Sequence, residues 1–283
     1  MGYPVVFGEG FERPVHRPGA LSIPTKIGLA VPNCKPGGHF QADQLRVSVN
    51  FLQQQGSCAV AKVCIFDAYG TLFDVAAAAR VAAEEPGRGA LAEVWPQIAA
   101  DWRAKQLEYS WLRAITGDYV TFWQVTQDGL DWAMARAGLD DLELRERLLA
   151  LYWELPAFKE APFVLARLQA AGVRSAILSN GNKDMLEGAV DSSGLGSFLE
   201  EVISVESAGI FKPARAVYDL VGARMGCAVS DVLFVSSNGW DVAGAAAYGF
   251  ETAWVNRAGA PVDRLMAEPA HILSDLNTIE DLV

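Results

Sequence analysis

Four apolar runs in this chain each end on polar residues that could do chemistry. The stretch KVCIFDAYGTLFDV puts Asp67 directly after such a run, and Ser179 and Asn180 follow a second run. Lys212 lies in the loop after a third run, and a polar group that ends at Asp241 follows the fourth. A carboxylate at the tip of a buried strand can act as a nucleophile or a general base, and a nearby lysine would keep it ionised. Any one of these residues alone is more often a turn or cap residue. Their joint occurrence predicts an active site.

The elements that must position these residues follow from the periodicity. Strand-length apolar runs recur at KVCIFD, VRSAILS, EVISV, DVLFVSS and ETAWVN, with helical stretches between them. This alternation predicts an α/β fold, a Rossmann-like parallel sheet covered on both faces. Ligands of such sheets bind outside the carboxyl ends of the strands, so the polar residues should meet in one crevice.

Between the first and second predicted strands the sequence has helical spacing only. Leu107, Trp111 and Ile115 form one apolar stripe, and Leu144 and Leu148 belong to another. This insertion is too long for a crossover helix. We therefore expect a helical cap over residues 77–159, inserted into a core made of residues 61–76 and 160–283.

Residues 1–60 have a different composition. They hold six of the 13 prolines and two of the three histidines, without a sustained helical or strand period. Such a segment buries too little apolar surface to offset the entropy of ordering. It is predicted to be a poorly ordered N-terminal extension, with a functional arm as the alternative.

Charge and composition limit the partners. The formal net charge is −11, whereas nucleic acids and anionic membranes favour basic surfaces. The sequence has neither an apolar run near the roughly 20 residues of a membrane helix nor the pattern of a signal peptide. Cysteines without CxxC spacing are typical of a reducing compartment; they are Cys34, Cys58, Cys64 and Cys227. A cytoplasmic enzyme that binds neither nucleic acid nor membrane is predicted.

Five motifs carry a family resemblance. FDAYGTLFD, WRAKQLEYSWLR, AILSNGN, FKPARAVY and LFVSSNGWD occur in this order and resemble the haloacid dehalogenase superfamily. More narrowly, they resemble its hydrolytic L-2-haloacid dehalogenases. The resemblance covers residues 62–283 and implies a core of this family's fold with an inserted helical cap.

Two departures separate the chain from the phosphatases of the superfamily. Those enzymes carry a second aspartate, two residues after the nucleophile, which protonates the leaving alkoxide; here Tyr69 occupies that place. A phenol with a pKa of about 10 is a weak acid for that step, and a departing halide needs no proton. The phosphatases also bind magnesium through an aspartate whose place is taken by Ser237, and a hydroxyl cannot replace a carboxylate there. We expect a reaction without metal or cofactor.

The resemblance also implies roles for the polar residues. Asp67 would attack the carbon that bears the halogen, and Arg103 and Asn180 would receive the halide. Lys212 would keep Asp67 ionised. As a lone residue, Arg103 would instead be a solvated helix charge, so its role rests on the motif. The residues expected to hold the substrate carboxylate and Asp67 are Ser179 and Thr71.

Hydrolysis of the resulting ester needs a base. His16 and His39 lie in the predicted extension and His271 follows the last motif, so histidine is not favoured. Asp241 is the best candidate. Ser236 and Asn238 would place the water, and Tyr218 would orient Lys212.

Four further residues match apolar pocket positions of the family, although aromatic residues at helical spacing are more often plain core. They are Tyr69, Leu107, Phe122 and Trp240.

The sequence therefore predicts an (S)-2-haloacid dehalogenase that converts short 2-haloalkanoic acids to (R)-2-hydroxyalkanoic acids and halide, with inversion. The alternatives are a small-molecule phosphatase of the same fold and a binding protein without catalytic activity. A homodimer paired partly through the cap is implied by the resemblance alone.

Overall fold

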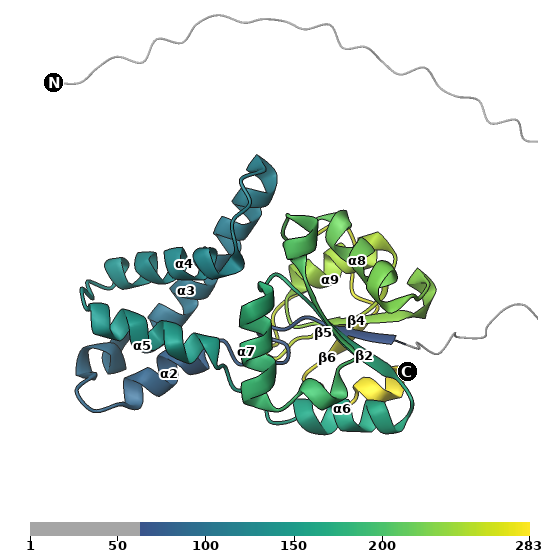
Figure 1. Cartoon of the computed structure of the whole chain (residues 1–283), viewed down its shortest axis with the longest axis horizontal. Coiled ribbons are helices and arrows are strands. Elements are labelled where there is room, and N and C mark those ends of the chain that lie inside the picture. The colour runs from purple at the N-terminus through teal and green to yellow at the C-terminus, as the bar shows by residue number, and fades with distance from the viewer. Residues whose placement is uncertain (1–62) are drawn as a thin grey trace, which may run out of the picture. The chain divides into compact units, whose positions relative to one another are not determined.

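A computed structural model describes residues 63–283 of the chain (Figure 1). The predicted extension, residues 1–60, and the first two residues of the predicted core lie outside the described residues. Among the helices of the described part, none is both long and apolar enough to cross a membrane.

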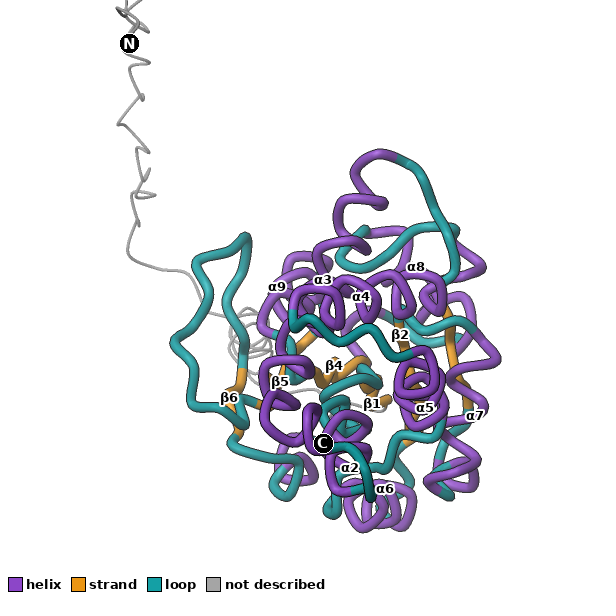
Figure 2. The backbone as a smooth tube through the Cα atoms, turned by 90° about the vertical axis from the view of Figure 1, so that its left-hand side faces the viewer, coloured by secondary structure: helices purple, strands orange, loops and turns teal. Residues whose placement is uncertain are grey.

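The described core contains a six-stranded parallel sheet with the order β3-β2-β1-β4-β5-β6, most of which can be followed in Figure 2. The five predicted strands are confirmed. A sixth, short strand was not predicted, because its three residues are half-buried or exposed and make no apolar run. The strands are β1 Val63–Phe66, β2 Arg174–Ser179, β3 Glu201–Ser204, β4 Val232–Ser236, β5 Glu251–Val255 and β6 His271–Leu273.

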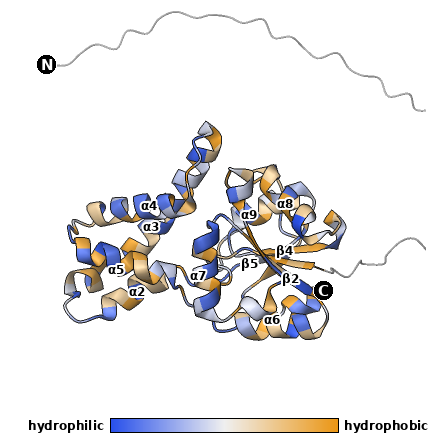
Figure 3. Cartoon of the chain, viewed as in Figure 1, coloured by the Kyte–Doolittle hydropathy of each residue, from blue (hydrophilic) through white to orange (hydrophobic). Residues whose placement is uncertain are grey.

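Helices cover the sheet on both sides. Helix α6 packs on β2 and α7 on β3, whereas α9 packs on β4 and β5; α8 and α9 lie on the side opposite α6 (Figure 1). All residues of β1 and β4 are buried, and the strands around β4 are coloured as hydrophobic in Figure 3. Burial on both faces explains why these strands read as continuous apolar runs. The helices are α6 Ala161–Ala170, α7 Lys183–Ser193, α8 Arg215–Met225 and α9 Gly239–Tyr248.

The predicted helical insertion is present. Helix α3 packs against both α2 and α4, and α2 packs against α5. Leu144 and Leu148 are buried as expected, but Ile115 near the end of the other stripe is 81% exposed. The domain boundaries at 76/77 and 159/160 stay a prediction. The inserted helices are α2 Ala77–Glu84, α3 Gly89–Thr116, α4 Phe122–Arg136 and α5 Leu142–Trp153.

The chain enters and leaves this cap through two segments that lie side by side. Phe73 and Ala157 form an antiparallel bridge, and the amide of Phe158 donates to the carbonyl of Leu72 over 2.8 Å. Arg257, which follows β5, donates to the carbonyl of Thr71 over 3.1 Å. The cap is therefore attached within a few residues of Asp67.

Candidate active site

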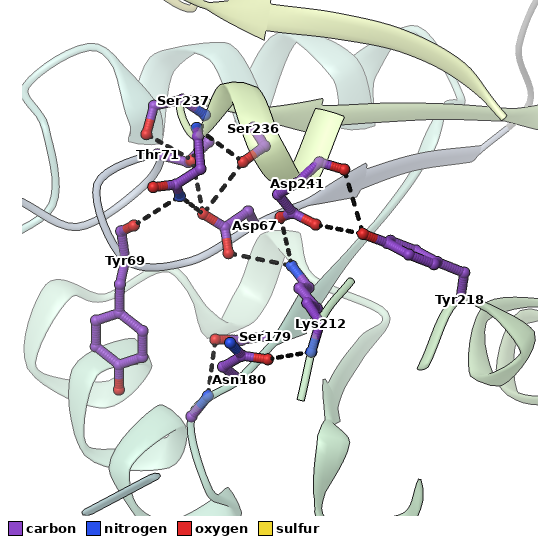
Figure 4. A network of polar contacts seen from close by, with 12 residues as sticks. Asp67, Tyr69, Thr71, Ser179, Asn180, Lys212, Tyr218, Ser236, Ser237 and Asp241 are labelled. Carbon is purple, nitrogen blue, oxygen red and sulfur yellow. Dashed lines mark hydrogen bonds and ion pairs between the residues drawn. The ribbon is translucent and has the colours of Figure 1, made fainter. Parts of the chain in front are cut away.

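The carboxyl ends of neighbouring strands bring the predicted site residues together (Figure 4). β1 lies between β2 and β4, and the amide of Asp67 continues the ladder by donating to the carbonyl of Val235 over 2.9 Å. The chain order reverses between β1 and β4, which is where ligands of open parallel sheets bind. Asp67 is 6% exposed there.

The two oxygens of the Asp67 carboxylate have different surroundings. Oδ2 accepts hydrogen bonds from Thr71 Oγ1 at 3.0 Å, Asn238 Nδ2 at 2.8 Å and Ser236 Oγ at 3.4 Å. Oδ1 contacts Lys212 Nζ at 3.2 Å. Oδ2 is thus held by three donors, and Oδ1 is the less occupied oxygen.

Lys212 is the cation at the centre of the site. Its ammonium lies between Asp67 and Asp241, 2.8 Å from Asp241 Oδ2, and its side chain is 1% exposed. Burial acts to lower the pKa of Lys212, but the charges of Asp241 and Asp67 outweigh burial and raise it. The Lys212 backbone amide donates to Asn180 Oδ1 over 2.9 Å, which fixes the loop that carries the lysine.

Asp241 lies in the first turn of α9 and is fully buried. Burial raises its pKa to about 6, with Lys212 acting in the opposite direction. Tyr218 donates to Asp241 Oδ1 over 2.8 Å. Tyr218 therefore contacts the carboxylate that binds Lys212 rather than Lys212 itself. Its role in orienting the lysine stays a prediction, and it would act through Asp241.

Arg103 reaches the core from α3. One guanidinium nitrogen donates to the carbonyl of Tyr69 at 3.3 Å and to Asn238 Oδ1 at 3.2 Å. The other donates to Gln106 Oε1 at 2.8 Å. Arg103 is therefore not a solvated helix charge, and it contacts Asn238, which also donates to Asp67.

The carboxyl end of β2 also contributes residues to the site. Ser179 Oγ accepts from the amide of Gly181 over 3.1 Å, which leaves the hydroxyl proton of Ser179 to donate. A Cβ on Gly181 would lie 2.8 Å from the ring of Tyr69, so the close approach of this turn requires glycine.

The predicted pocket residues fall into two groups. Tyr69 stacks on Tyr152 with ring centroids 5.7 Å apart and lies 5.8 Å from Phe122. Burial raises the pKa of Tyr69 well above its usual value, so its phenol is an even weaker acid here. Trp240 packs edge-on against Trp111 at 5.4 Å instead.

The two tryptophans line an apolar groove of about 510 Å³ between α3 and the core. Besides the two tryptophans, the lining of this groove includes Ile115, Phe211, Leu265 and Met266. Leu107, one turn after Arg103 on α3, is partly buried and is not among its lining residues.

Ser237, which stands where the phosphatases carry a magnesium-binding aspartate, contacts Thr71 in this structure. Its amide donates to Thr71 Oγ1 over 2.8 Å. Within residues 63–283, no group of three or more His, Cys, Asp or Glu side chains is placed to hold a metal ion. Independence of metal and cofactor stays a prediction, and Lys212 occupies the position between the two carboxylates.

Sequence reasoning missed Gln106, a buried partner of Arg103, and the two residues that bind Gln106 in turn. Gln106, Thr126 and Tyr152 form a polar network inside the cap. Gln106 is part of the WRAKQLEY motif and lies one helical turn after Arg103, which was the available signal.

Comparisons with known proteins agree on the family. Residues 61–249 match the model of the haloacid dehalogenase-like hydrolases. The chain is 42% identical to (S)-2-haloacid dehalogenase 1 of Pseudomonas sp. (strain CBS-3) over 78% of its own length and 96% of that protein's. It is 39% identical to (S)-2-haloacid dehalogenase 4A of Burkholderia cepacia over 78% of this chain and 94% of that protein.

A solved structure of L-2-haloacid dehalogenase from Xanthobacter autotrophicus, with chloropropionic acid covalently bound, has a TM-score of 0.67. It is 35% identical, and the match covers 78% of this chain and 98% of that one. The family resemblance of the five motifs is confirmed. By sequence and by fold, the chain belongs to the haloacid dehalogenase-like hydrolases.

Proposed function

We propose that this chain is an (S)-2-haloacid dehalogenase, which hydrolyses short 2-haloalkanoic acids to (R)-2-hydroxyalkanoic acids and halide. The observation that carries the proposal is the pair of unlike oxygens on Asp67, one held by three donors and one facing Lys212. This arrangement suits a carboxylate that forms an ester through Oδ1, while Oδ2 stays held by its donors. Water then hydrolyses the ester. The relatives that match most of the chain are named for the same activity.

In the first step, Oδ1 of Asp67 attacks the carbon that bears the halogen. The new bond joins Oδ1 to this carbon, the carbon–halogen bond breaks, and the halide leaves with the electron pair. Arg103 and Asn180 receive the halide, and Ser179 binds the substrate carboxylate. Attack from the side opposite the halogen inverts the carbon once.

In the second step, water attacks the carboxyl carbon of Asp67 and gives a proton to Asp241. Negative charge develops on Oδ2, where Thr71, Ser236 and Asn238 already donate. Donors aimed at developing charge lower the barrier because they need no reorganisation. The bond between the carboxyl carbon of Asp67 and Oδ1 then breaks, Asp241 gives its proton to the departing Oδ1, and the hydroxy acid leaves with this oxygen.

The pH dependence of ester hydrolysis should follow Asp241. Because only the ionised carboxylate can take a proton, hydrolysis should accelerate as the pH rises through the pKa of Asp241 in the ester and level off above it. This pKa should lie below the value of about 6 in the free enzyme, because the negative charge of Asp67 helps to raise that value and is absent from the ester. Rapid quenching and mass spectrometry of the Asp67 peptide, between pH 5 and 8, measure the decay of the ester.

The variant Asp241→Asn is the control for this assignment. It should release about one halide per active site and then stop, because the ester forms but is not hydrolysed. Continued turnover by this variant, or ester decay that is independent of pH in the unmodified enzyme, would remove Asp241 as the base.

Halide release from 2-chloropropionate tests the function itself. We expect sustained release from the (S) enantiomer after dialysis against a chelator, because Lys212 supplies the positive charge beside Asp67. A generic phosphate ester supplied with magnesium is the comparison. Phosphate release without halide release would favour the phosphatase instead.

We also propose a homodimer. Leu112 and Ile115 on α3 are 51% and 81% exposed, and burial against a second copy would remove this apolar surface from water. Light scattering of the protein distinguishes a dimer from the 30.5 kDa monomer. A cytoplasmic location stays a prediction.

A further inference from the structure

The cap contains a buried polar network that ends on Arg103. Gln106 is 1% exposed and lies at its centre. Its amide nitrogen donates to Thr126 Oγ1 over 2.7 Å and to Tyr152 over 3.0 Å, and its amide oxygen accepts from Arg103 over 2.8 Å. The network joins α3, α4 and α5, so all three helices help to place one side chain.

The chemistry of the partners fixes the direction of the hydrogen bonds that Gln106 makes with Arg103 and Thr126, whereas the Tyr152 hydroxyl lies within reach of both amide atoms. Arginine only donates, so the amide oxygen of Gln106 must face Arg103 and the amide nitrogen must face away. Thr126 can accept from that nitrogen because its own hydroxyl donates to the carbonyl of Phe122 over 2.8 Å. The chain of donors and acceptors from α4 to Arg103 is therefore complete, and a glutamine fits it in only one orientation.

We propose that Gln106 is a positioning residue, which holds the guanidinium of Arg103 where the halide departs. This inference rests on the proposed dehalogenase function. The two nitrogens of Arg103 are divided between the cap, through Gln106, and the core, through Asn238 and the carbonyl of Tyr69. Without Gln106, the long and flexible side chain of Arg103 loses its hydrogen bond on the cap side. Its guanidinium group can then rotate away from the core.

A misplaced guanidinium should affect substrates unequally. Chloride is a poorer leaving group than bromide and concentrates its charge in a smaller ion, so its departure depends more on a positioned cation. Loss of Gln106 should therefore slow the chloro substrate more than the bromo substrate. A general loosening of the cap would slow both equally.

The test compares Gln106→Met with the matched variant Thr126→Val. The first removes the acceptor for Arg103, and the second removes the far end of the network while the Gln106–Arg103 bond stays. Single-turnover rates on (S)-2-chloropropionate and (S)-2-bromopropionate are measured for each. For Gln106→Met we expect a loss of about 100-fold on the chloro substrate, the typical effect of a catalytic group misplaced by 1 Å, and a smaller loss on the bromo substrate. For Thr126→Val we expect an unchanged ratio of the two rates.

Two further variants make the outcome decisive. In an Arg103→Ala background the substitution of Gln106 should cost nothing more, because a residue that acts through another shows no independent effect. If Gln106→Met does not fold, Gln106→Asn keeps a buried amide but is one methylene too short to reach Arg103, and it should raise the bromo-to-chloro rate ratio in the same way.

Equal losses on both substrates, or additive losses with Arg103→Ala, would overturn the inference and leave the function intact. An unmodified enzyme that releases no halide from either substrate would overturn the function and the inference with it.

Discussion

In oxygen-18 water, with enzyme in excess over substrate, the first 2-hydroxy acid released should carry no label. Its hydroxyl oxygen comes from Oδ1 of Asp67, because water opens the ester at the carboxyl carbon rather than at the substrate carbon. The label should appear in the peptide that contains Asp67, and the product should have the (R) configuration. Mass spectrometry of both products of a single turnover makes the measurement.

The same experiment separates a nucleophile from a base. If Asp67 only activated water, the first product would be labelled and the Asp67 peptide would not, and the covalent step would have to be abandoned. Excess substrate is the internal control, since later turnovers use an already labelled carboxylate. Asp67→Ala should reduce halide release to the background rate, because the group that forms the ester is gone.

Lys212→Met should lower turnover at least about 100- to 1,000-fold, the typical effect of losing one preorganised stabiliser of charge. The ammonium is 3.2 Å from Asp67 and 2.8 Å from Asp241. Without it, two buried carboxylates face each other and must share a proton, so that Asp67 and Asp241, the proposed nucleophile and base, are no longer both ionised. Steady-state kinetics with (S)-2-chloropropionate measures the loss. Lys183→Met is the matched control, because Lys183 is 72% exposed and pairs with Glu187 on the surface of α7.

The stability of Lys212→Met should depend on pH with a defined sign. The pKa of Asp241 is already raised to about 6 with the lysine present, and loss of the lysine should raise it further. The pKa of an aspartate in the unfolded state is about 4. A carboxyl group with a higher pKa in the folded state stabilises the fold at low pH, and this contribution is lost as the pH rises through the folded pKa. The deficit in melting temperature, relative to the unmodified protein, should therefore be larger at pH 8 than at pH 5. An equal deficit at both values would contradict the buried carboxylate pair.

The sheet and the residues at its carboxyl edge were predictable because they leave local signals. Strands buried on both faces appear as continuous apolar runs, and polar residues directly after such runs must lie at one edge of a parallel sheet. Asp67 and Asp241 follow from this rule. The strand β6 does not, because three residues at the edge of the sheet carry too little apolar character.

Contacts between distant elements left no such signal. Tyr218 lies six residues after Lys212, and this spacing favoured a contact between them; the packing of α8 against α9 instead directs the hydroxyl to Asp241. The partners of Gln106 come from two other helices of the cap. Their meeting depends on how the cap packs, which the spacing within one motif does not encode.

The paired segments that carry the cap have a consequence for the timing of the reaction. Arg257 belongs to the core and donates to the carbonyl of Thr71. The next hydrogen bonds along the chain join Leu72 and Asp74 to Phe158 and Pro156, in the segment by which the chain leaves the cap. A cap that swings about these segments would carry Arg103 away from Asn238 and leave Asp67 bound to Thr71. An opened enzyme would then keep the Asp67 carboxylate aligned but lack Arg103, the cation proposed to receive the halide. Substrate and halide could exchange with solvent in that state, and bond breaking would begin only after closure.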